Sequence, residues 1–259
     1  MIYIHKEEEP PMVRAWKAKR GHVTYKDMPM PLRRELRNAL LREQGYVCCF
    51  CGTALGRKEN TCIVQMPLAR GEHHNVRNAH IAPQSRAPDR VLDYDNICAS
   101  CDGSFNRMRY PDVRKEAHCD IRQGDALLPV TPLQEDCLSY FSFSADGSVH
   151  PNPAKSLEDQ EKARQTIAIL GLNAGILRCM RAGLLRLIEE VVHKIQEKGW
   201  PDGDGEAGVA ALLDNLARRD RDGRFAPFYF VALSYFGRAQ GTGKDSPGPS
   251  LPDCLKCPA

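Results

Sequence analysis

The sequence predicts an α+β protein in which a zinc-stapled core lies between an N-terminal helical segment and a C-terminal helical subdomain. Residues 46–125 contain most of the cysteines and show little apolar periodicity, which is typical of small metal-stapled units. Residues 137–150 alternate apolar and polar side chains around a turn, which predicts a β-hairpin. On both sides of this region apolar residues recur every three or four positions, which predicts helices.

The composition indicates a globular chain. It has 259 residues, 42% apolar and 27% charged, enough for one large domain or two packed parts. No apolar run reaches the ~18–20 residues of a membrane span, and the first residues lack a signal-peptide pattern. We therefore expect a cytoplasmic location and no membrane association. Lys and Arg number 36 against 33 Asp and Glu, so only local basic clusters can indicate nucleic-acid binding.

The first two expected segments are residues 1–45 and 46–153. Residues 1–30 are polar and proline-interrupted, which predicts an irregular arm that is a candidate docking element. The stretch "MPLRRELRNALLREQG" then predicts a helix, with Pro31 in its first turn and Gly45 as its stop signal. Residues 46–153 form the metal-stapled domain and include the hairpin.

Residues 154–237 are expected to form the helical subdomain, and the Gly-, Pro- and Ser-rich residues 238–259 a disordered tail. A capping signal at "SLED" and apolar repeats predict one long amphipathic helix to about Lys198. Another helix is expected from about Glu206 to Arg219, and the aromatic stretch after it predicts a buried final helix. Its aromatic residues belong either to the core or to a docking surface: Phe228, Tyr229, Phe230, Tyr235 and Phe236.

Eleven cysteines are many for a cytosolic chain, and their odd number favours metal binding over a complete disulfide framework. The pair Cys48/Cys51 in "CCFCG" predicts one half of a zinc site, because two thiolates on a tight turn can reach one tetrahedral ion. Its partner is either the pair Cys98/Cys101 or a set that includes Cys119. The remaining cysteines are interpreted as an incidental pair, Cys254/Cys257, and as small buried hydrophobes, Cys62, Cys137 and Cys179.

The segments "HIAPQS" and "DYDN", preceded by the "CCFCG" knuckle, resemble the HNH endonuclease superfamily over about residues 48–124. The resemblance implies a ββα-metal core, with a histidine at the end of one strand, an asparagine in the following loop and a histidine, asparagine or aspartate on the helix. The longer series "AHIAPQS", "LDYDNICASC", "HCDIRQGD" and "PLQEDC" is similar to the HNH component of Septu-type and retron-associated antiphage systems, over most of residues 30–195.

That resemblance implies a toxic nuclease controlled by an ABC-type ATPase partner, and a reverse transcriptase with its non-coding RNA or DNA product if the system is retron-associated. It also implies a structural Zn²⁺ held by Cys48, Cys51, Cys101 and Cys119, the last reached across an insertion, "DGSFNRMRYPDVRKEA". Cys98 becomes a spare thiol. Four thiolates leave no open position for water, so this zinc is not catalytic.

The same resemblance implies the catalytic residues. His80 is the general base that activates water for attack on a phosphodiester, and Mg²⁺ or another divalent ion assists. Asn96 orients the histidine-bearing loop. Asp120 takes the helix position of a metal ligand, with His118 as the neighbouring candidate.

Two residues depart from the family pattern. Ala79 stands where many HNH sites have a metal-ligating side chain, and Gln123 stands where relatives often have lysine. Either Asn78, His73 or His74 supplies the missing ligand, or one protein ligand with phosphate and waters suffices, or the nuclease is weakened or inactive. Because His80, Asn96 and Asp120 are all present, we favour retained activity.

Five arginines flank the expected site and are candidates for neutralising the phosphate backbone: Arg77, Arg86, Arg90, Arg107 and Arg109. The expected substrate is DNA, with RNA such as tRNA as the alternative. The competing function, from a different class, is a catalytically weak or inactive zinc-ribbon module that binds nucleic acid or protein without cutting.

Overall fold

The computed structural model describes residues 1–19, 23–56, 76–103, 117–198 and 205–239. This part of the chain is α+β and contains seven α-helices and two antiparallel two-stranded sheets, β1–β2 and β3–β4. The helices are α1 (Pro11–Ala18), α2 (Met30–Glu43), α4 (Asp120–Gln123), α5 (Leu157–Leu170), α6 (Gly175–Lys198), α7 (Gly205–Ala217) and α8 (Tyr229–Ala239). The strands are β1 (Val76–His80), β2 (Ile97–Cys101), β3 (Phe141–Phe143) and β4 (Val149–Pro151).

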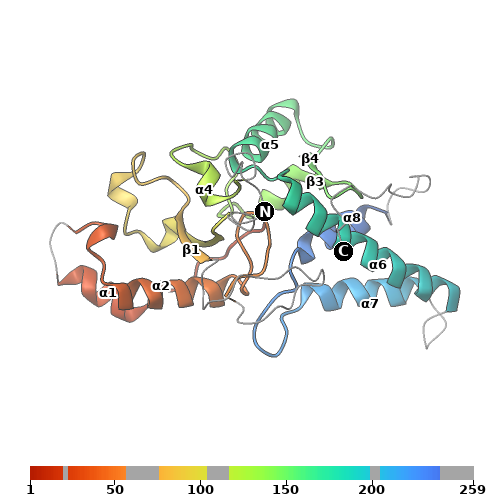
Figure 1. Ribbon diagram of the computed structural model, residues 1–259, viewed down its shortest axis with the longest axis horizontal. Coiled ribbons are helices and arrows are strands. Elements are labelled where there is room, and N and C mark those ends of the chain that lie inside the picture. Colours follow the sequence, from red (N-terminus) through yellow and green to blue (C-terminus); the bar gives the residue numbers. More distant parts are fainter. Residues whose placement is uncertain (20–22, 57–75, 104–116, 199–204, 240–259) are drawn as a thin grey trace, which may run out of the picture.

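Four 3₁₀ turns connect these elements: η1 (Tyr25–Asp27), η2 (Pro88–Arg90), η3 (Tyr94–Asn96) and η4 (Cys137–Tyr140). Figure 1 shows α1, α2 and β1 in one half of the molecule and α6, α7 and α8 in the other, with the β3–β4 hairpin between them. Helix α7 packs on α6 and α8, and α2 packs on both strands of the first sheet.

The N-terminal segment is more ordered than the sequence predicts. An irregular arm over residues 1–30 is wrong for Pro11–Ala18, which form α1, because Pro11 suits the first helical position where its missing N–H has no partner to lose. Met1, Ile2 and Ile4 are buried in the core, and the backbone N–H of Ile4 donates to the carbonyl of Pro132 at 2.7 Å. The predicted helix that follows is confirmed as α2.

The C-terminal end of α2 is tied to β2 by buried polar side chains. Gln44 accepts a hydrogen bond from the backbone N–H of Ala99 at 2.6 Å and donates one to the Ala99 carbonyl at 2.8 Å. Glu43 accepts from Lys6 Nζ at 2.6 Å and from the Tyr94 hydroxyl at 3.1 Å. Helix α2, the N-terminal segment and β2 therefore hold one another in a fixed arrangement.

The predicted hairpin is confirmed, but its first strand begins later than expected. Residues 137–140 form the 3₁₀ turn η4, and the ladder runs from the Phe141–Pro151 pair to the Phe143–Val149 pair. The tight turn between the strands contains Gly147, whose φ is +78°.

Gly147→Ala is expected to destabilise the protein by more than the ~1–2 kcal/mol that a positive φ costs an L-residue. The reason is that an added Cβ would overlap the backbone carbonyl oxygen of Arg178, on α6, which cannot move without distorting the helix. Gly223→Ala is the matched control, because Gly223 also has a positive φ of +74° but its Cβ would meet nothing within 4 Å. Urea unfolding measures both variants, and equal losses would contradict close packing of the hairpin on α6.

The single long helix predicted to Lys198 is wrong: the segment is two helices, α5 and α6, bent by 113°. Gly171 ends α5 in the left-handed conformation, with φ 59°. Its N–H bonds to the Ala168 carbonyl and that of Leu172 to the Ile167 carbonyl, as in a glycine-terminated helix. Among the described residues no single helix is both long and apolar enough to cross a membrane, although this bent pair passes the same test of length and composition.

The last two predicted helices are confirmed as α7 and α8. Phe228, Phe230 and Phe236 are buried in the core, and the backbone N–H of Phe228 donates to the Gly52 carbonyl at 2.9 Å. These three rings are therefore core and not docking surface, while Tyr229 and Tyr235 are partly buried against them. Cys137 is buried as expected, whereas Cys179 is half-buried and disulfide-bonded instead of a buried hydrophobe.

The predictions for the disordered tail from residue 240 onward, for the Cys254/Cys257 pair and for Cys62 lie outside the described residues.

Candidate functional site

The β1–β2 ladder brings together the two motifs that are separated in the sequence. Its register pairs His80 with Ile97, Ala79 with Cys98 and Val76 with Cys101. His80 therefore ends one strand directly beside the start of the next, which Asn96 precedes. Helix α4 packs against β1 and begins at Asp120.

Four cysteines form a buried cluster at the other end of this ladder. Cys48 and Cys51 come from the knuckle after α2, Cys101 ends β2, and Cys119 directly precedes α4. Their sulfurs lie within 4.8 Å of one another, with Sγ–Sγ distances of 3.9 Å for Cys48–Cys119 and 3.8 Å for Cys51–Cys101. A tetrahedral zinc with Zn–S bonds of about 2.3 Å places its sulfurs about 3.8 Å apart. The cluster can therefore bind zinc.

Strand geometry decides which of the alternative cysteines belongs to the cluster. Cys98 and Cys101 both lie in β2, where residues three apart point to opposite faces. A CxxC pair in an extended strand cannot form a knuckle, so the Cys98/Cys101 pairing is wrong and Cys119 completes the set. Cys98 is fully buried outside the cluster.

Without a bound cation, the surroundings of the cluster disfavour a thiolate at Cys119. Burial and then the neighbouring thiols raise the pKa of the Cys119 thiol well above its usual value, and a bound divalent cation offsets that cost because ligand sulfurs bind as thiolates. The guanidinium of Arg181, on α6, is 1% exposed and lies within electrostatic range of Cys51 and Cys119. Burial lowers the pKa of Arg181 to about 10, so it stays cationic at neutral pH and balances the thiolate charge.

His118 belongs to the cysteine cluster and not to the group around Asp120. Its side chain is fully buried, with Nδ1 3.3 Å from the Cys119 sulfur and 3.6 Å from the Cys101 sulfur. Nε2 has no hydrogen-bond partner among the described residues. The structure therefore does not place His118 where it would help Asp120 hold a second ion.

His80 is held in one orientation by both of its ring nitrogens. Nε2 lies 2.9 Å from the carbonyl oxygen of Val91, and Nδ1 lies 3.3 Å from the amide nitrogen of Gln84. Since a carbonyl only accepts, the proton is on Nε2 and the lone pair is on Nδ1. Burial lowers the pKa of His80 below its usual 6.5, against the opposing effects of the Val91 carbonyl and Asp120. The imidazole is therefore neutral, with its basic nitrogen toward Gln84, an exposed residue.

Asn96 ties together the loop that follows His80. Its buried amide accepts from the backbone N–H of Ala82 at 2.8 Å and donates to the carbonyls of Ala82 at 3.0 Å and Arg90 at 3.2 Å. The backbone carbonyl of Asn96 also accepts from Ile81 N–H at 2.9 Å. These bonds fix both ends of the segment that leads from His80 to Val91, while a role of Asn96 in catalysis stays a prediction.

Asp120 is paired with Arg77, whose Nε lies 2.5 Å from a carboxylate oxygen. Arg77 shares a strand face with Ala79, which is fully buried opposite Cys98. The small side chain at position 79 is explained by this burial, because a carboxylate there would lie against Cys98. The amide oxygen of Asn78, the alternative ligand, accepts from Arg37 Nε at 3.3 Å, and its role as a metal ligand stays a prediction.

The other predicted residues are distributed as follows. Gln123 is buried and donates to the Ile81 carbonyl at 3.0 Å, so it supports the loop after His80 and does not face phosphate. Arg90 pairs with Asp93 at 2.9 Å, and Arg86 lies 3.4 Å from the carbonyl oxygen of Asp125. The remaining predicted residues lie outside the described part of the chain: His73, His74, Arg107 and Arg109.

Sequence reasoning missed residues whose roles depend on the fold. Gln84 and Val91 fix the imidazole, and the ring of Tyr25 meets that of His80 edge-on, with centroids 5.0 Å apart. Arg181 donates to the carbonyls of Gly147 and Leu172 within electrostatic range of Cys51 and Cys119. The position of Gln84 could have been predicted from the sequence, since it lies four residues after His80 in the motif "HIAPQS". The others could not, because only tertiary packing brings them to the site.

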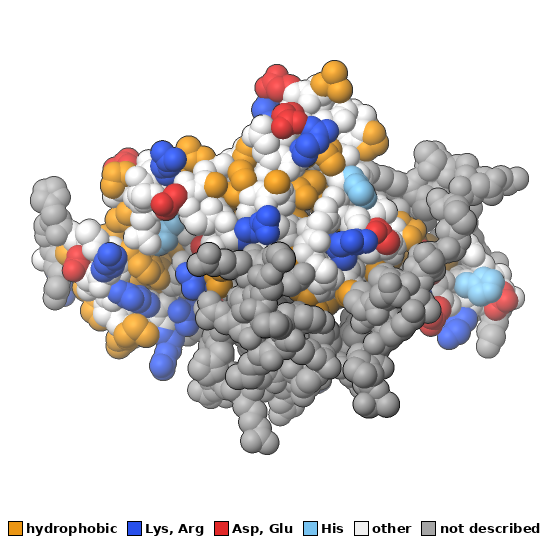
Figure 2. Space-filling view, turned by 45° about the horizontal axis from the view of Figure 1, so that its top comes forward, with side chains coloured by type: hydrophobic (Ala, Val, Ile, Leu, Met, Phe, Trp, Pro, Cys, Tyr) orange, Lys and Arg blue, Asp and Glu red, His pale blue; other side chains and the backbone are white. Residues whose placement is uncertain are grey.

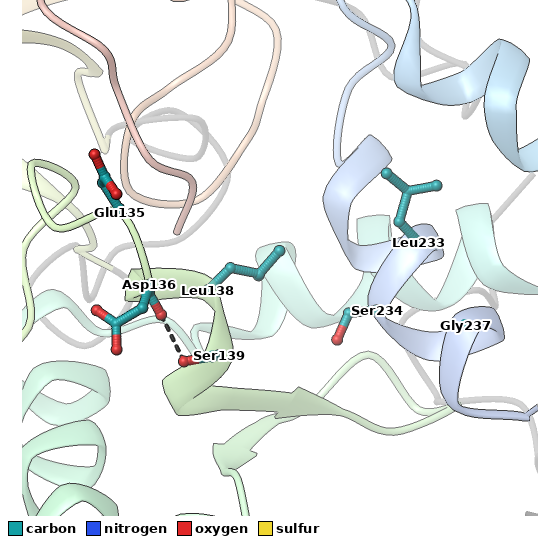
Figure 3. Close-up of a pocket in the computed structure, with 7 residues that line it drawn as sticks. All are labelled: Glu135, Asp136, Leu138, Ser139, Leu233, Ser234 and Gly237. Carbon is teal, nitrogen blue, oxygen red and sulfur yellow. Dashed lines mark hydrogen bonds between the residues drawn. The ribbon is translucent and has the colours of Figure 1, made fainter. Parts of the chain in front are cut away.

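A surface hollow lies between η4 and α8, where Leu138 points toward Leu233 and the Ser139 hydroxyl donates to the Asp136 carbonyl (Figure 3). Neither His80, Asn96 nor Asp120 lines it, and its rim carries Glu135 and Asp136. Asp136 is paired with Lys155 at 3.5 Å, but no described basic residue lines the hollow, so nothing there favours phosphate and it is no candidate for a nucleic-acid site.

The sequence matches no family model and has no significant match among curated proteins.

Proposed function

We propose that this protein is a metal-dependent endonuclease that hydrolyses phosphodiester bonds of nucleic acid, with DNA as the default substrate and RNA as the alternative. The observation that carries the proposal is the neutral imidazole of His80. Val91 fixes its orientation, its basic Nδ1 lies toward the exposed Gln84, and the Asp120 carboxylate is within electrostatic range of the ring. The four-cysteine cluster joins the Cys48–Cys51 knuckle, β2 and the start of α4, and a zinc ion held by four thiolates would have no open coordination position for chemistry.

His80 acts as the general base. Nδ1 accepts a proton from water while Nε2–H keeps its bond to the Val91 carbonyl, and the resulting hydroxide oxygen attacks phosphorus as the bond to the leaving oxygen breaks. The long contact from Gln84, at 3.3 Å, is weak enough for a water to replace it. Asn96 keeps the loop that carries Val91 in place, so the tautomer is maintained.

Asp120 is the residue that would hold the divalent ion. Its side chain is 17% exposed, and Mg²⁺ commonly uses one or two carboxylates together with substrate phosphate and waters, so a single ligand fits. When bound, Mg²⁺ stabilises negative charge on the phosphate as the bond breaks. Arg77, which now pairs with Asp120, would then be available to a phosphate oxygen.

The resemblance to antiphage HNH components supports a proposal for the cellular role: the nuclease is the toxic effector of a defence complex that an ABC-type ATPase controls. Expressing the chain alone and with the ATPase encoded beside it tests this control. We expect toxicity that the ATPase suppresses and that His80→Ala removes.

The competing function is a zinc module that binds without cutting. One observation favours it: Asp120 is already neutralised by Arg77, and buried Ala79 offers no second ligand.

The decisive experiment measures Mg²⁺-dependent cleavage of end-labelled DNA and RNA. His80→Ala is expected to lose about 10²- to 10⁴-fold in rate, the usual contribution of a general base. His150→Ala is the matched control, since His150 is an exposed histidine on the hairpin. Wild-type activity should fall as the pH drops through the lowered pKa of His80, below 6.5, because protonation removes the base. Equal cleavage by both variants would leave the binding module as the better description.

A further inference from the structure

Two of the three described arginines that the sequence predicts around His80 are paired with carboxylates, and the third, Arg86, lies 3.4 Å from the backbone carbonyl of Asp125. Arg77 pairs with Asp120 at 2.5 Å and Arg90 with Asp93 at 2.9 Å. A guanidinium with a carboxylate partner must exchange that partner for phosphate, which lowers its contribution to binding. Arginines without carboxylate partners are therefore better candidates for binding the phosphates of a nucleic-acid backbone.

Helix α2 supplies three of them: Arg33, Arg34 and Arg37. Spacings of three and four residues place their side chains on one region of the helix surface. Within the described residues none of the three has a carboxylate at ion-pair distance, whereas Glu35 on the same helix pairs with Arg42 at 3.8 Å. Figure 2 shows Lys and Arg side chains gathered at the left of the molecule, the end that carries α1 and α2 in Figure 1.

Neutral groups hold two of these guanidinium groups in place. Arg33 donates to the carbonyls of Tyr25 at 3.1 Å and Lys26 at 2.7 Å, and its guanidinium lies 5.1 Å from the centre of the Tyr25 ring. Among the described residues Arg37 donates through Nε alone, to the amide oxygen of Asn78 at 3.3 Å. Pre-positioned guanidinium groups lose little entropy on binding an anion, and their geometry matches phosphate oxygens.

This arginine group borders His80. Asn78 and His80 share one face of β1, because they are two residues apart in a strand. The Tyr25 hydroxyl accepts a hydrogen bond from Asn78 at 2.9 Å, and the Tyr25 ring meets the His80 ring edge-on. Arg33 and Arg37 are thus connected to the imidazole through Tyr25 and Asn78, and Arg34 lies next to them on the helix.

We propose that Arg33, Arg34 and Arg37 of α2 form the surface that binds the sugar–phosphate backbone of the nucleic acid and leads it to His80. The inference rests on the proposed function for its partner. Because guanidinium groups contact phosphate and not base edges, this surface binds without regard to sequence, and α2 is part of the nucleic-acid interface in addition to being a support for β1 and β2.

The test measures binding without cleavage. Labelled 20-nucleotide duplex DNA, single-stranded DNA and single-stranded RNA are titrated in magnesium-free buffer over a salt series, with fluorescence anisotropy as the readout. The variant Arg34→Ala/Arg37→Ala spares Arg33, whose bonds support the fold. The variant Arg42→Ala/Arg164→Ala removes the same charge from two other exposed arginines and is the matched control.

We expect the first variant to bind at least about tenfold more weakly and to lower the slope of log K against log salt by about two, one for each lost phosphate contact. The control should stay within about twofold of wild type. Equal losses in both variants, or no binding of any of the three nucleic acids by the wild type, would overturn the proposal. If binding depends on Arg34 and Arg37 but the protein shows no Mg²⁺-dependent cleavage, this surface is supported and the nuclease is refuted. If the double variant cleaves as fast as the wild type, the nuclease is supported and this surface is refuted.

Discussion

Cys119→Ser is expected to abolish the native packing of the Cys48–Cys51 knuckle, β2 and α4, because it removes one ligand of the candidate zinc site that joins these three segments. Structural zinc sites contribute about 10–16 kcal/mol of apparent binding free energy, which is comparable to or larger than the total stability of a typical protein. The backbone of Cys119 is also held at a positive φ of 58°, a conformation that an L-residue keeps only when its surroundings impose it. Zinc content per chain and thermal unfolding measure the effect.

Cys98→Ser is the matched control for this prediction. Cys98 is also a fully buried cysteine and lies on β2 close to the ligand Cys101, but its sulfur is outside the cluster. The variant should keep one zinc per chain and lose only a modest amount of stability, since a buried hydroxyl replaces a weakly polar thiol. If the two variants retained equal zinc, or the wild type bound none, the four-cysteine site would be refuted.

The sequence predicted those parts of the fold that depend on local patterns. Helix α2 followed from apolar spacing with Pro31 and Gly45 at its ends, the hairpin from alternation around a turn, and α8 from an apolar, aromatic stretch. The break between α5 and α6 was missed because the apolar repeat continues across it, and only the left-handed conformation of Gly171 shows where the chain turns. Helix α1 was missed because proline was interpreted as interrupting structure when it begins a helix.

The candidate site shows the same division between local and non-local information. Spacing alone left Cys98 and Cys119 as rivals, although the family resemblance favoured Cys119. The structure gives the physical reason, which is that Cys98 lies in an extended strand. The burial of Ala79, the pairing of Arg77 with Asp120 and the position of His118 against the thiolates all depend on tertiary contacts. Motifs therefore indicate which residues carry the chemistry, but which of them face one another is decided by packing.

Asn96→Ala is expected to destabilise the protein by about 3 kcal/mol or more, because it leaves three backbone groups of the His80 loop without partners at about 1–3 kcal/mol for each that stays buried. These are the N–H and carbonyl of Ala82 and the carbonyl of Arg90. Cleavage should fall as well, even under conditions where the variant is folded, since the Val91 carbonyl that fixes His80 is in the same loop. Urea unfolding and the cleavage rate measure the two effects separately.

Asn173→Ala separates this positioning role from a general loss of stability. Asn173 makes the same kind of amide clamp, accepting from the Val149 N–H at 2.8 Å and donating to the Val149 carbonyl at 2.9 Å, but it is exposed and supports the hairpin. Water can replace its bonds, so we expect a smaller loss of stability and an unchanged cleavage rate. Wild-type cleavage by folded Asn96→Ala would show that His80 keeps its orientation without the asparagine. The imidazole would then depend only on its direct contacts with Val91, Gln84 and Tyr25.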